Sequence, residues 1–330
     1  MPTPRMPTRR RLLAACAALV GVPHGRGFAA GDIAGGKPIT LVVSYPAGGG
    51  ADVMARLVAP RLAEALGQPV IVENKPGASG TLAAAQVARA TPDGATLLLD
   101  ASSFAVNPSL FDKLPYDTAS AFAPLAVLAL YPNALVCTPS FEARSVADVL
   151  RLARAKPGTL AYASSGNGSA QHLAGALFEA MAKVELSHIP YRGGGPALND
   201  VMGGQVPLFF ANVASSLGHI QSGRLRALAV TSRLRSRVLP DIPALEEAGL
   251  KGYEVLEWNP VLAPAAVPAP VRARLAAALR QAMADPELLA RVRALGGEVF
   301  GGAEAEAAAF LKAQQVLWAR VVRERHIARD

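Results

Sequence analysis

The chain has 330 residues, of which 51% are apolar and only 5% aromatic. This length exceeds the size at which one hydrophobic core stops growing, so we expect two lobes; the few aromatics favour a helix-rich α/β protein over a β-sandwich. The formal net charge is +8. Five arginines precede residue 31, where no acidic residue occurs, so the rest of the chain has 28 basic and 25 acidic residues. This near balance, with no basic run interleaved with aromatics, argues against a nucleic-acid partner.

The first 30 residues have the composition of an export signal. A basic stretch ends at Arg11, an apolar segment runs from Leu12 to Val22, and small residues follow. This pattern predicts a signal peptide over 1–30, cleaved near Ala29 or Ala30, with the Sec and twin-arginine routes both open. Cys137 is then the only cysteine of the mature chain, which excludes an intrachain disulfide, and no later segment is long enough to span a membrane.

Strand and helix patterns alternate over residues 37–100. The β-branched and apolar runs predict strands at 39–45, 69–73 and 96–100, and the helical spacing of apolar residues predicts helices at 52–66 and 81–90. This order indicates a parallel βαβαβ unit, in which ligands bind where loops leave the carboxyl ends of the strands. Three loops fall at those ends: 46–51, 74–80 and 101–103.

The first of these loops contains Gly48, Gly49 and Gly50, followed by Asp52. Three glycines let the backbone turn sharply and approach a ligand, and Asp52 is the predicted N-cap of the next helix. The free N–H groups and the dipole of such a helix start favour an anion. Neither the P-loop motif nor the dinucleotide fingerprint is present, so a nucleotide phosphate is the weaker interpretation.

A second alternating block follows an apolar stretch at 127–139, which Tyr131-Pro132-Asn133 interrupts and which we interpret as a crossing between lobes. Helices are predicted at 145–155, 170–183 and 197–202, and strands at 160–163, 186–191, 207–211 and 226–231. The loops 164–169 and 192–196 repeat the strand, glycine turn and helix arrangement. A return crossing at 253–263 and three helices at 270–285, 286–295 and 303–325 complete a hinged two-lobed protein with glycine loops facing each other.

Polar side chains in these loops allow more than one interpretation. Ser164, Ser165 and Ser169 lack the nucleophile-elbow motif and fit better as hydrogen-bond donors than as a catalytic group. His172 is either a structural hydrogen-bonding residue or a ligand contact, and Arg192 either pairs with a carboxylate or is solvated. Tyr45 and Tyr191 end strands and are expected to wall the cleft. The histidines lack metal-ligand spacing, so we expect no metal and no cofactor.

Several long motifs resemble one family. VVSYPAGGGADVMARL, GQPVIVENKPGASGTLAA, YASSGNGSAQHLAGALF and IPYRGGGPALNDVMGGQV occur in the order found in the periplasmic solute receptors of tripartite tricarboxylate transporters. The resemblance covers nearly the whole mature chain. It implies an α/β fold of the type II periplasmic binding protein class: two doubly wound lobes joined by two crossing strands, with the ligand cleft between them. Ala51 stands where relatives often have threonine, which puts the identity of the bound acid in doubt.

The resemblance further implies a receptor, not an enzyme, that binds a small organic carboxylate (a di- or tricarboxylate, an acidic amino acid or an aromatic acid) and delivers it to membrane permease subunits from the periplasm. We expect a monomer with lobe 1 formed by 31–132 and 255–330 and lobe 2 by 133–254. Alternatives are an exported sensing domain for a signalling partner and a nucleotide-dependent enzyme. The residues expected to bind the ligand are Tyr45, Ala47, Gly48, Gly49, Ala51, Asp52, Ser79, Ser102, Ser103, Ser164, Ser165, Asn167, Gly168, Ser169, Tyr191, Arg192, Gly194, Gly195 and Asn212.

Overall fold

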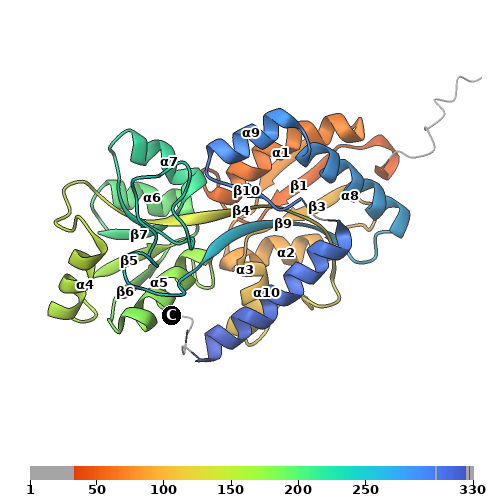
Figure 1. Ribbon diagram of the computed structural model, residues 1–330. Helices are drawn as coiled ribbons and strands as arrows, with labels where there is room; N and C mark the ends of the chain where they lie inside the picture. The colour runs from red at the N-terminus through yellow and green to blue at the C-terminus, as the bar shows by residue number, and fades with distance from the viewer. Residues whose placement is uncertain (1–32, 302, 325–326, 328–330) are drawn as a thin grey trace, which may run out of the picture.

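The computed structural model describes residues 33–301, 303–324 and 327. The predicted signal peptide and its cleavage site lie outside these residues. Two lobes lie side by side, and two strands run from one into the other (Figure 1). A single 3-10 turn, η1 (Ile33–Gly36), precedes the first strand. Within the described residues, no helix combines the length and the apolar composition that crossing a membrane requires.

The first lobe begins with the predicted alternating unit. Strand β1 pairs in parallel with β2 on one side and β3 on the other, which confirms the parallel arrangement. The side chains of Ile39, Leu41 and Val43 are fully buried in β1, as expected for a central strand covered on both faces. The elements are β1 (Ile39–Val43), α1 (Gly50–Leu66), β2 (Val70–Asn74), η2 (Ala78–Gly80), α2 (Thr81–Ala88), β3 (Thr96–Leu99) and α3 (Ser103–Leu110).

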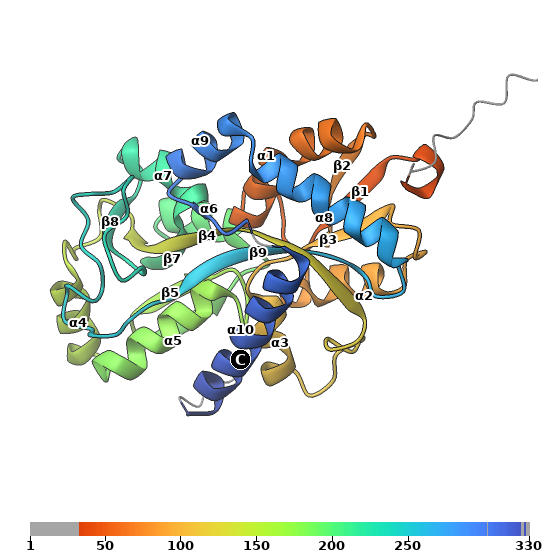
Figure 2. The same cartoon turned by 45° about the vertical axis from the view of Figure 1, so that its right-hand side comes forward.

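Two long antiparallel strands connect the lobes. Strand β4 (Phe122–Cys137) pairs with β9 (Leu256–Pro264) from Phe122 to Pro132, and from Asn133 onward it pairs with strands of the second lobe. The stretch that we interpreted as a crossing is therefore one continuous strand, and it runs through Tyr131-Pro132-Asn133 without a break. Pro132 lies where β4 exchanges one partner for another, an irregular position at which a missing N–H is tolerated. Figure 2 shows both strands passing between the lobes.

The second lobe repeats the strand and helix alternation. Parallel strands β5, β6 and β7 form one part of its sheet, and β7 and β8 each pair antiparallel with the end of β4. The whole sheet has the order β2-β1-β3-β9-β4-β7-β5-β6. The elements are α4 (Val146–Ala155), β5 (Ala161–Ser164), α5 (Ala170–Ala182), β6 (Ser187–Pro190), α6 (Gly194–Met202), β7 (Leu208–Asn212), α7 (Val213–Gln221) and β8 (Arg226–Val230).

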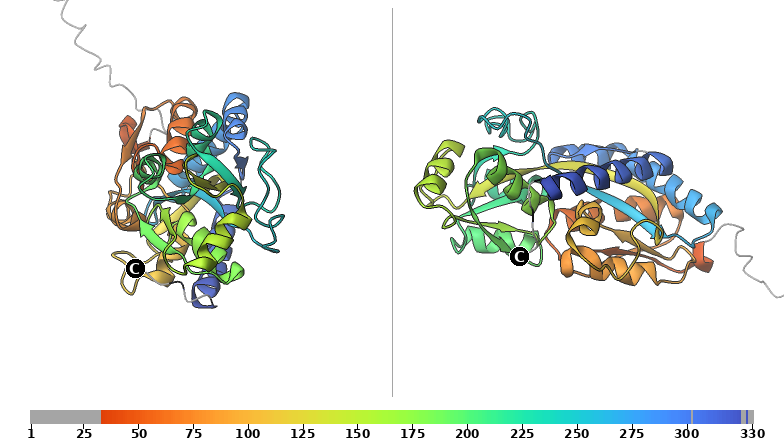
Figure 3. Two further views of the ribbon diagram at one scale, coloured as in Figure 1. Left: turned by 90° about the vertical axis from the view of Figure 1, so that its left-hand side faces the viewer. Right: turned by 90° about the horizontal axis from the view of Figure 1, so that it is seen from below.

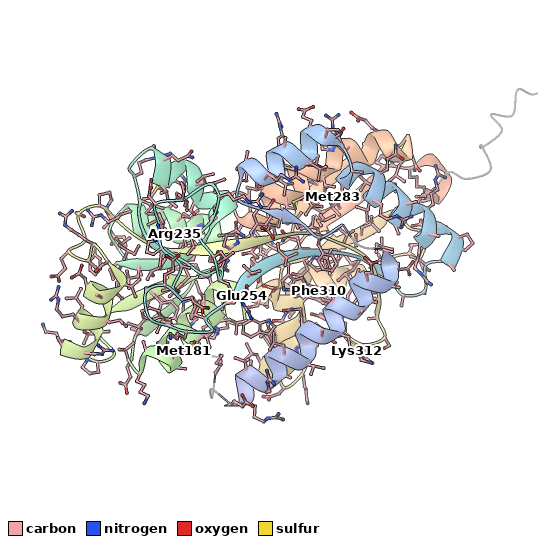
Figure 4. The ribbon with its side chains drawn as sticks, in the orientation of Figure 1. Met181, Arg235, Glu254, Met283, Phe310 and Lys312 are labelled. Carbon is pink, nitrogen blue, oxygen red and sulfur yellow. The ribbon has the colours of Figure 1, made fainter. Side chains whose placement is uncertain are left out.

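The C-terminal elements pack back along the first lobe and the crossing strands. Helix α8 (Ala269–Met283) lies against α1, α9 (Pro286–Ala294) follows it, and the short strand β10 (Glu298–Val299) pairs with β4. Helix α10 (Glu304–Glu324) packs on α3 and β4, and Figure 3 shows it running toward the second lobe. Phe310, labelled in Figure 4, meets the buried Trp258 of β9 edge-on, with ring centroids 5.2 Å apart.

Candidate functional site

The first glycine loop contributes the start of helix α1. Gly49 is the N-cap and the helix begins at Gly50, so the prediction that Asp52 caps it was wrong. Asp52 lies within the first turn, where its carboxylate accepts hydrogen bonds from the Gly48 amide at 3.0 Å and the Asn74 side chain at 2.9 Å, and pairs with Arg56 at 2.9 Å. Burial opposes ionisation, but the bonds from Arg56, Gly48 and Asn74 prevail and lower its pKa. Asp52 therefore fixes the shape of the loop.

The serine-rich loop of the second lobe positions helix α5. Ser169 is its N-cap, and its Oγ accepts from the amide of His172 at 3.2 Å. The Nδ1 of His172 accepts in turn from the Gly168 amide at 3.0 Å, and its ring stacks on His188 with centroids 4.2 Å apart. Ser164 Oγ accepts from the Gly166 amide at 3.0 Å and lies 2.6 Å from His188 Nε2. These contacts hold the loop closed on itself, which supports the structural interpretation of His172.

The two lobes touch through their glycine loops. A Cβ atom on Gly193 would lie 2.3 Å from Pro46 Cδ, and one on Gly195 would lie 2.7 Å from the Ala47 carbonyl oxygen. Gly193 also has a φ of 152°, a backbone conformation that other residues rarely adopt. Glycine is therefore required here by close approach between lobes. Helix α6 begins at Gly194, three residues earlier than the sequence pattern predicted.

Four helices begin around one inner cavity between the lobes. The first residues of α1, α5 and α6 line it, as do Ser215 of α7 and Asn212, the N-cap of α7, whose Oδ1 accepts from the Ala214 amide at 2.8 Å. The first turn of an α-helix leaves its N–H groups without partners inside the helix, and the helix dipole makes that end positive. The cavity has a volume of about 20 Å³ and is lined by Tyr45, Gly49, Gly50, Ala51, Ala101, Ser165, Ser169, Ala170, Gln171, Gly194, Phe209, Asn212, Ser215 and Glu257.

Buried polar groups of the first lobe support one wall of this cavity. The Tyr45 hydroxyl donates to Ser103 Oγ at 2.8 Å, and Ser44 Oγ donates to the fully buried Asp100 at 2.5 Å. Burial raises the pKa of Tyr45 well above its usual value. Tyr45 therefore acts as a neutral, fixed wall, as the sequence suggested.

An outer pocket of about 420 Å³ adjoins the inner cavity and shares Tyr45 and Ser165 with it. Arg192 is exposed on its rim, and Ser79 lies in the left-handed conformation with φ of 53°. The pocket is lined by Tyr45, Gly77, Ala78, Ser79, Gly80, Thr81, Phe111, Ser165, Gly166, Asn167, Pro190, Tyr191 and Arg192. The cleft thus has an enclosed inner part and a wider outer part.

Eleven of the predicted site residues line one of these two spaces. Those of the inner cavity are Tyr45, Gly49, Ala51, Ser165, Ser169, Gly194 and Asn212, and those of the outer pocket alone are Ser79, Asn167, Tyr191 and Arg192. The other predicted residues line neither space: Ala47, Gly48, Asp52, Ser102, Ser103, Ser164, Gly168 and Gly195. Of these, Ser103, Ser164, Gly48 and Gly168 support the walls through the hydrogen bonds described above.

Two functional candidates were missed from the sequence. Gln171 lies in the first turn of α5, and Glu257 lies on β9 beside Trp258; both line the inner cavity. An acidic residue in the mainly apolar run LEWNPVLAP was the signal that could have identified Glu257. Among the described residues, Glu257 is the only charged side chain lining the inner cavity, and no three His, Cys, Asp or Glu side chains gather closely enough to hold a metal ion.

Known proteins with this architecture are close in sequence as well. The family model described as "Tripartite tricarboxylate transporter family receptor" matches residues 54–327. Protein BugT of Bordetella pertussis is 34% identical over 290 residues, covering 87% of this chain and 89% of BugT. The UPF0065 protein of Pseudomonas sp. strain P51, encoded in the tcbD–tcbE intergenic region, is 37% identical over 317 residues, covering 96% of this chain and 94% of that protein.

Solved structures agree with the fold. The periplasmic binding protein BugD is 35% identical with a TM-score of 0.85, covering 89% of this chain and 99% of BugD. MatC of Rhodopseudomonas palustris, solved with bound malate, is 32% identical with a TM-score of 0.82, covering 87% of this chain and 99% of MatC. An R. palustris protein solved with adipate is 34% identical with a TM-score of 0.86, covering 89% and 99%. Chain length, architecture and sequence all match receptors and not enzymes, and the chain belongs to the tripartite tricarboxylate transporter receptor family.

Proposed function

We propose that this protein is a periplasmic receptor that closes around a small organic carboxylate and delivers it to the membrane subunits of a tripartite tricarboxylate-type transporter. One observation carries the carboxylate assignment: four helix N-termini from both lobes line a single inner cavity. Oriented N–H groups at helix starts bind carboxylates without arginines or lysines. The malate and adipate bound by two relatives support the same ligand class.

Binding requires the lobes to separate. The inner cavity, at about 20 Å³, has room for about one water molecule, and the loops around Ala47 and Gly195 are already in contact. We infer that residues 31–132 with 255–330 move against residues 133–254 about strands β4 and β9. The ligand then favours the closed form, because only that form adds contacts from both lobes.

The carboxylate assignment is tested by a thermal-shift panel of mono-, di- and tricarboxylates, followed by calorimetric titration of those that raise the melting temperature. Mass spectrometry of the protein as purified would identify a retained acid. We expect at least one carboxylate to stabilise the fold, since a ligand that binds only the native state raises its stability. Stabilisation by NAD or ATP, with no response to any carboxylate, would overturn the assignment.

Delivery to a transporter needs a separate experiment. The receptor and the candidate permease pair encoded near it would be co-expressed, and uptake of the radiolabelled acid compared with and without the receptor. Uptake that depends on the receptor is expected. Uptake unaffected by the receptor, with binding intact, would favour a sensing role instead.

A further inference from the structure

We propose that the inner cavity takes a carboxylate that also carries an ammonium group, and that Glu257 receives the ammonium. This inference rests on the proposed function and specifies its ligand class. The helix N-termini would hold the ligand carboxylate, and Glu257 would hold the opposite charge. A zwitterionic amino acid fits such a cavity better than a plain di- or tricarboxylate.

Glu257 lines the inner cavity, although it belongs to a crossing strand, β9. Glu257 is only 5% exposed. A Cβ atom on Gly50 would lie 3.0 Å from Glu257 Oε1, so the carboxylate lies close to the first turn of α1. The other oxygen, Oε2, accepts from the Gln171 side-chain amide in the first turn of α5. Glu257 therefore contacts both lobes at the point where they meet.

The partners of Glu257 in the protein are neutral. Gln171 Nε2 also donates to Asn133 Oδ1 at 2.9 Å, so it belongs to a buried amide network and brings no charge. Burial raises the pKa of Glu257, and the Gln171 and Asn212 side-chain amides act against that rise. In the described part of the chain, no lysine or arginine lines the cavity. The Glu257 carboxyl group has the start of α1 and side-chain amides near it but no cation, and an ammonium that arrives with the ligand would favour its ionised form.

The same carboxylate disfavours other ligands. An ionised Glu257 would repel the two negative charges of a plain dicarboxylate, because like charges repel strongly in an enclosed space away from water. An ammonium placed at Glu257 converts that repulsion into attraction. Glu257 thus supplies both an attractive element for one class of acid and a repulsive element against another.

The experiment compares ligand pairs that differ only by an amino group: aspartate with succinate, β-alanine with propionate, and 4-aminobutyrate with butyrate. Dissociation constants are measured by titration calorimetry for the wild-type protein and for Glu257→Gln. For at least one pair, we expect the wild type to bind the amino member tenfold or more tightly. Glu257→Gln should reduce that preference to less than about threefold and should improve binding of the plain dicarboxylate.

Glu254→Gln is the matched control. Glu254, labelled in Figure 4, is three residues earlier, exposed, and paired with Arg233 at 3.2 Å. The Glu254→Gln substitution removes the same charge outside the cavity and should leave the preference for the amino member of each pair unchanged. If Glu257→Gln does not fold, as judged by circular dichroism, Glu257→Asp replaces it, and we expect weaker binding with the preference for the amino member retained.

Two results would overturn the inference. Equal binding of both members of every pair by the wild type would show that no ammonium is recognised, while leaving the carboxylate assignment intact. An amino preference that survives Glu257→Gln would show that another group recognises the ammonium. Absence of binding by any acid to wild type and variants would instead overturn the proposed function and this inference together.

Discussion

Replacing Gly195 with alanine should weaken ligand binding without weakening the fold. Gly195 is the second residue of α6, and its added Cβ would lie 2.7 Å from the Ala47 carbonyl oxygen of the other lobe, whereas ordinary contacts begin near 3.4 Å. The loops must therefore stay apart by several tenths of an ångström. Gly195 does not adopt a left-handed conformation, so a positive φ does not oppose alanine there, although Pro196 follows and makes the helical conformation less favourable for a residue with a Cβ.

The size of the effect follows from where the clash occurs. Overpacking by one methyl group typically costs about 1–3 kcal/mol, and here the cost falls only on the closed form. If the closed form is the one that holds the ligand, the dissociation constant should rise about 5- to 150-fold. Titration calorimetry, with whichever acid gives the largest thermal shift, measures this change directly.

Gly218→Ala is the control for the substitution itself. Gly218 lies inside α7 in the same lobe, and a Cβ there meets nothing within 4 Å. Alanine at Gly218 should raise the free energy of unfolding slightly, by about 0.4–1 kcal/mol, because it restricts the unfolded chain without a clash in the folded one. An unchanged dissociation constant for Gly195→Ala would refute the claim that closure brings these two loops into contact.

Two further predictions concern stability. Gly175→Ala places a Cβ 2.1 Å from the Tyr162 ring, so the free energy of unfolding in urea should fall by about 1–3 kcal/mol; stability equal to that of Gly218→Ala would contradict this. Burial raises the pKa of Asp100 from 3.8 to about 6, so the folded form binds the proton more tightly than the unfolded chain. The contribution of Asp100 to stability should therefore fall as pH rises from about 4 to 6, by up to about 3 kcal/mol, and then level off, whereas Asp52, whose pKa is lowered, acts in the opposite direction. Asp100→Asn should remove that fall, and urea unfolding of both proteins at pH 4, 5, 6 and 7 checks it.

Much of the fold could be predicted because it is encoded locally. The alternation of apolar strands and amphipathic helices was sufficient for the parallel units and the two crossings. Two helices were missed because their sequences contain helix-weakening residues, Pro108 in α3 and Gly218 in α7. The start of α1 was displaced because Asp52 satisfies the Gly48 amide from within the helix instead of capping it.

The site was only partly predictable for a different reason. Glycine loops and helix starts can be recognised from neighbouring residues, so Gly49, Ser169 and Gly194 were identified. Glu257 and Gln171 are 86 positions apart and meet only because β9 crosses between the lobes beside α5. No local pattern reports such a contact, and an acidic residue in a strand is more often exposed than buried.

The convergence of four helix starts on one cavity also bears on how such receptors diversify. A point mutation replaces a side chain but leaves the main-chain N–H group in place. Most substitutions therefore do not remove the groups that are best suited to bind an anion. Change is confined to the few side chains that share the cavity with those amides, such as Ala51, Ser215 and Glu257. A lineage built on this frame can therefore acquire a new ligand through one or two substitutions while retaining the same architecture.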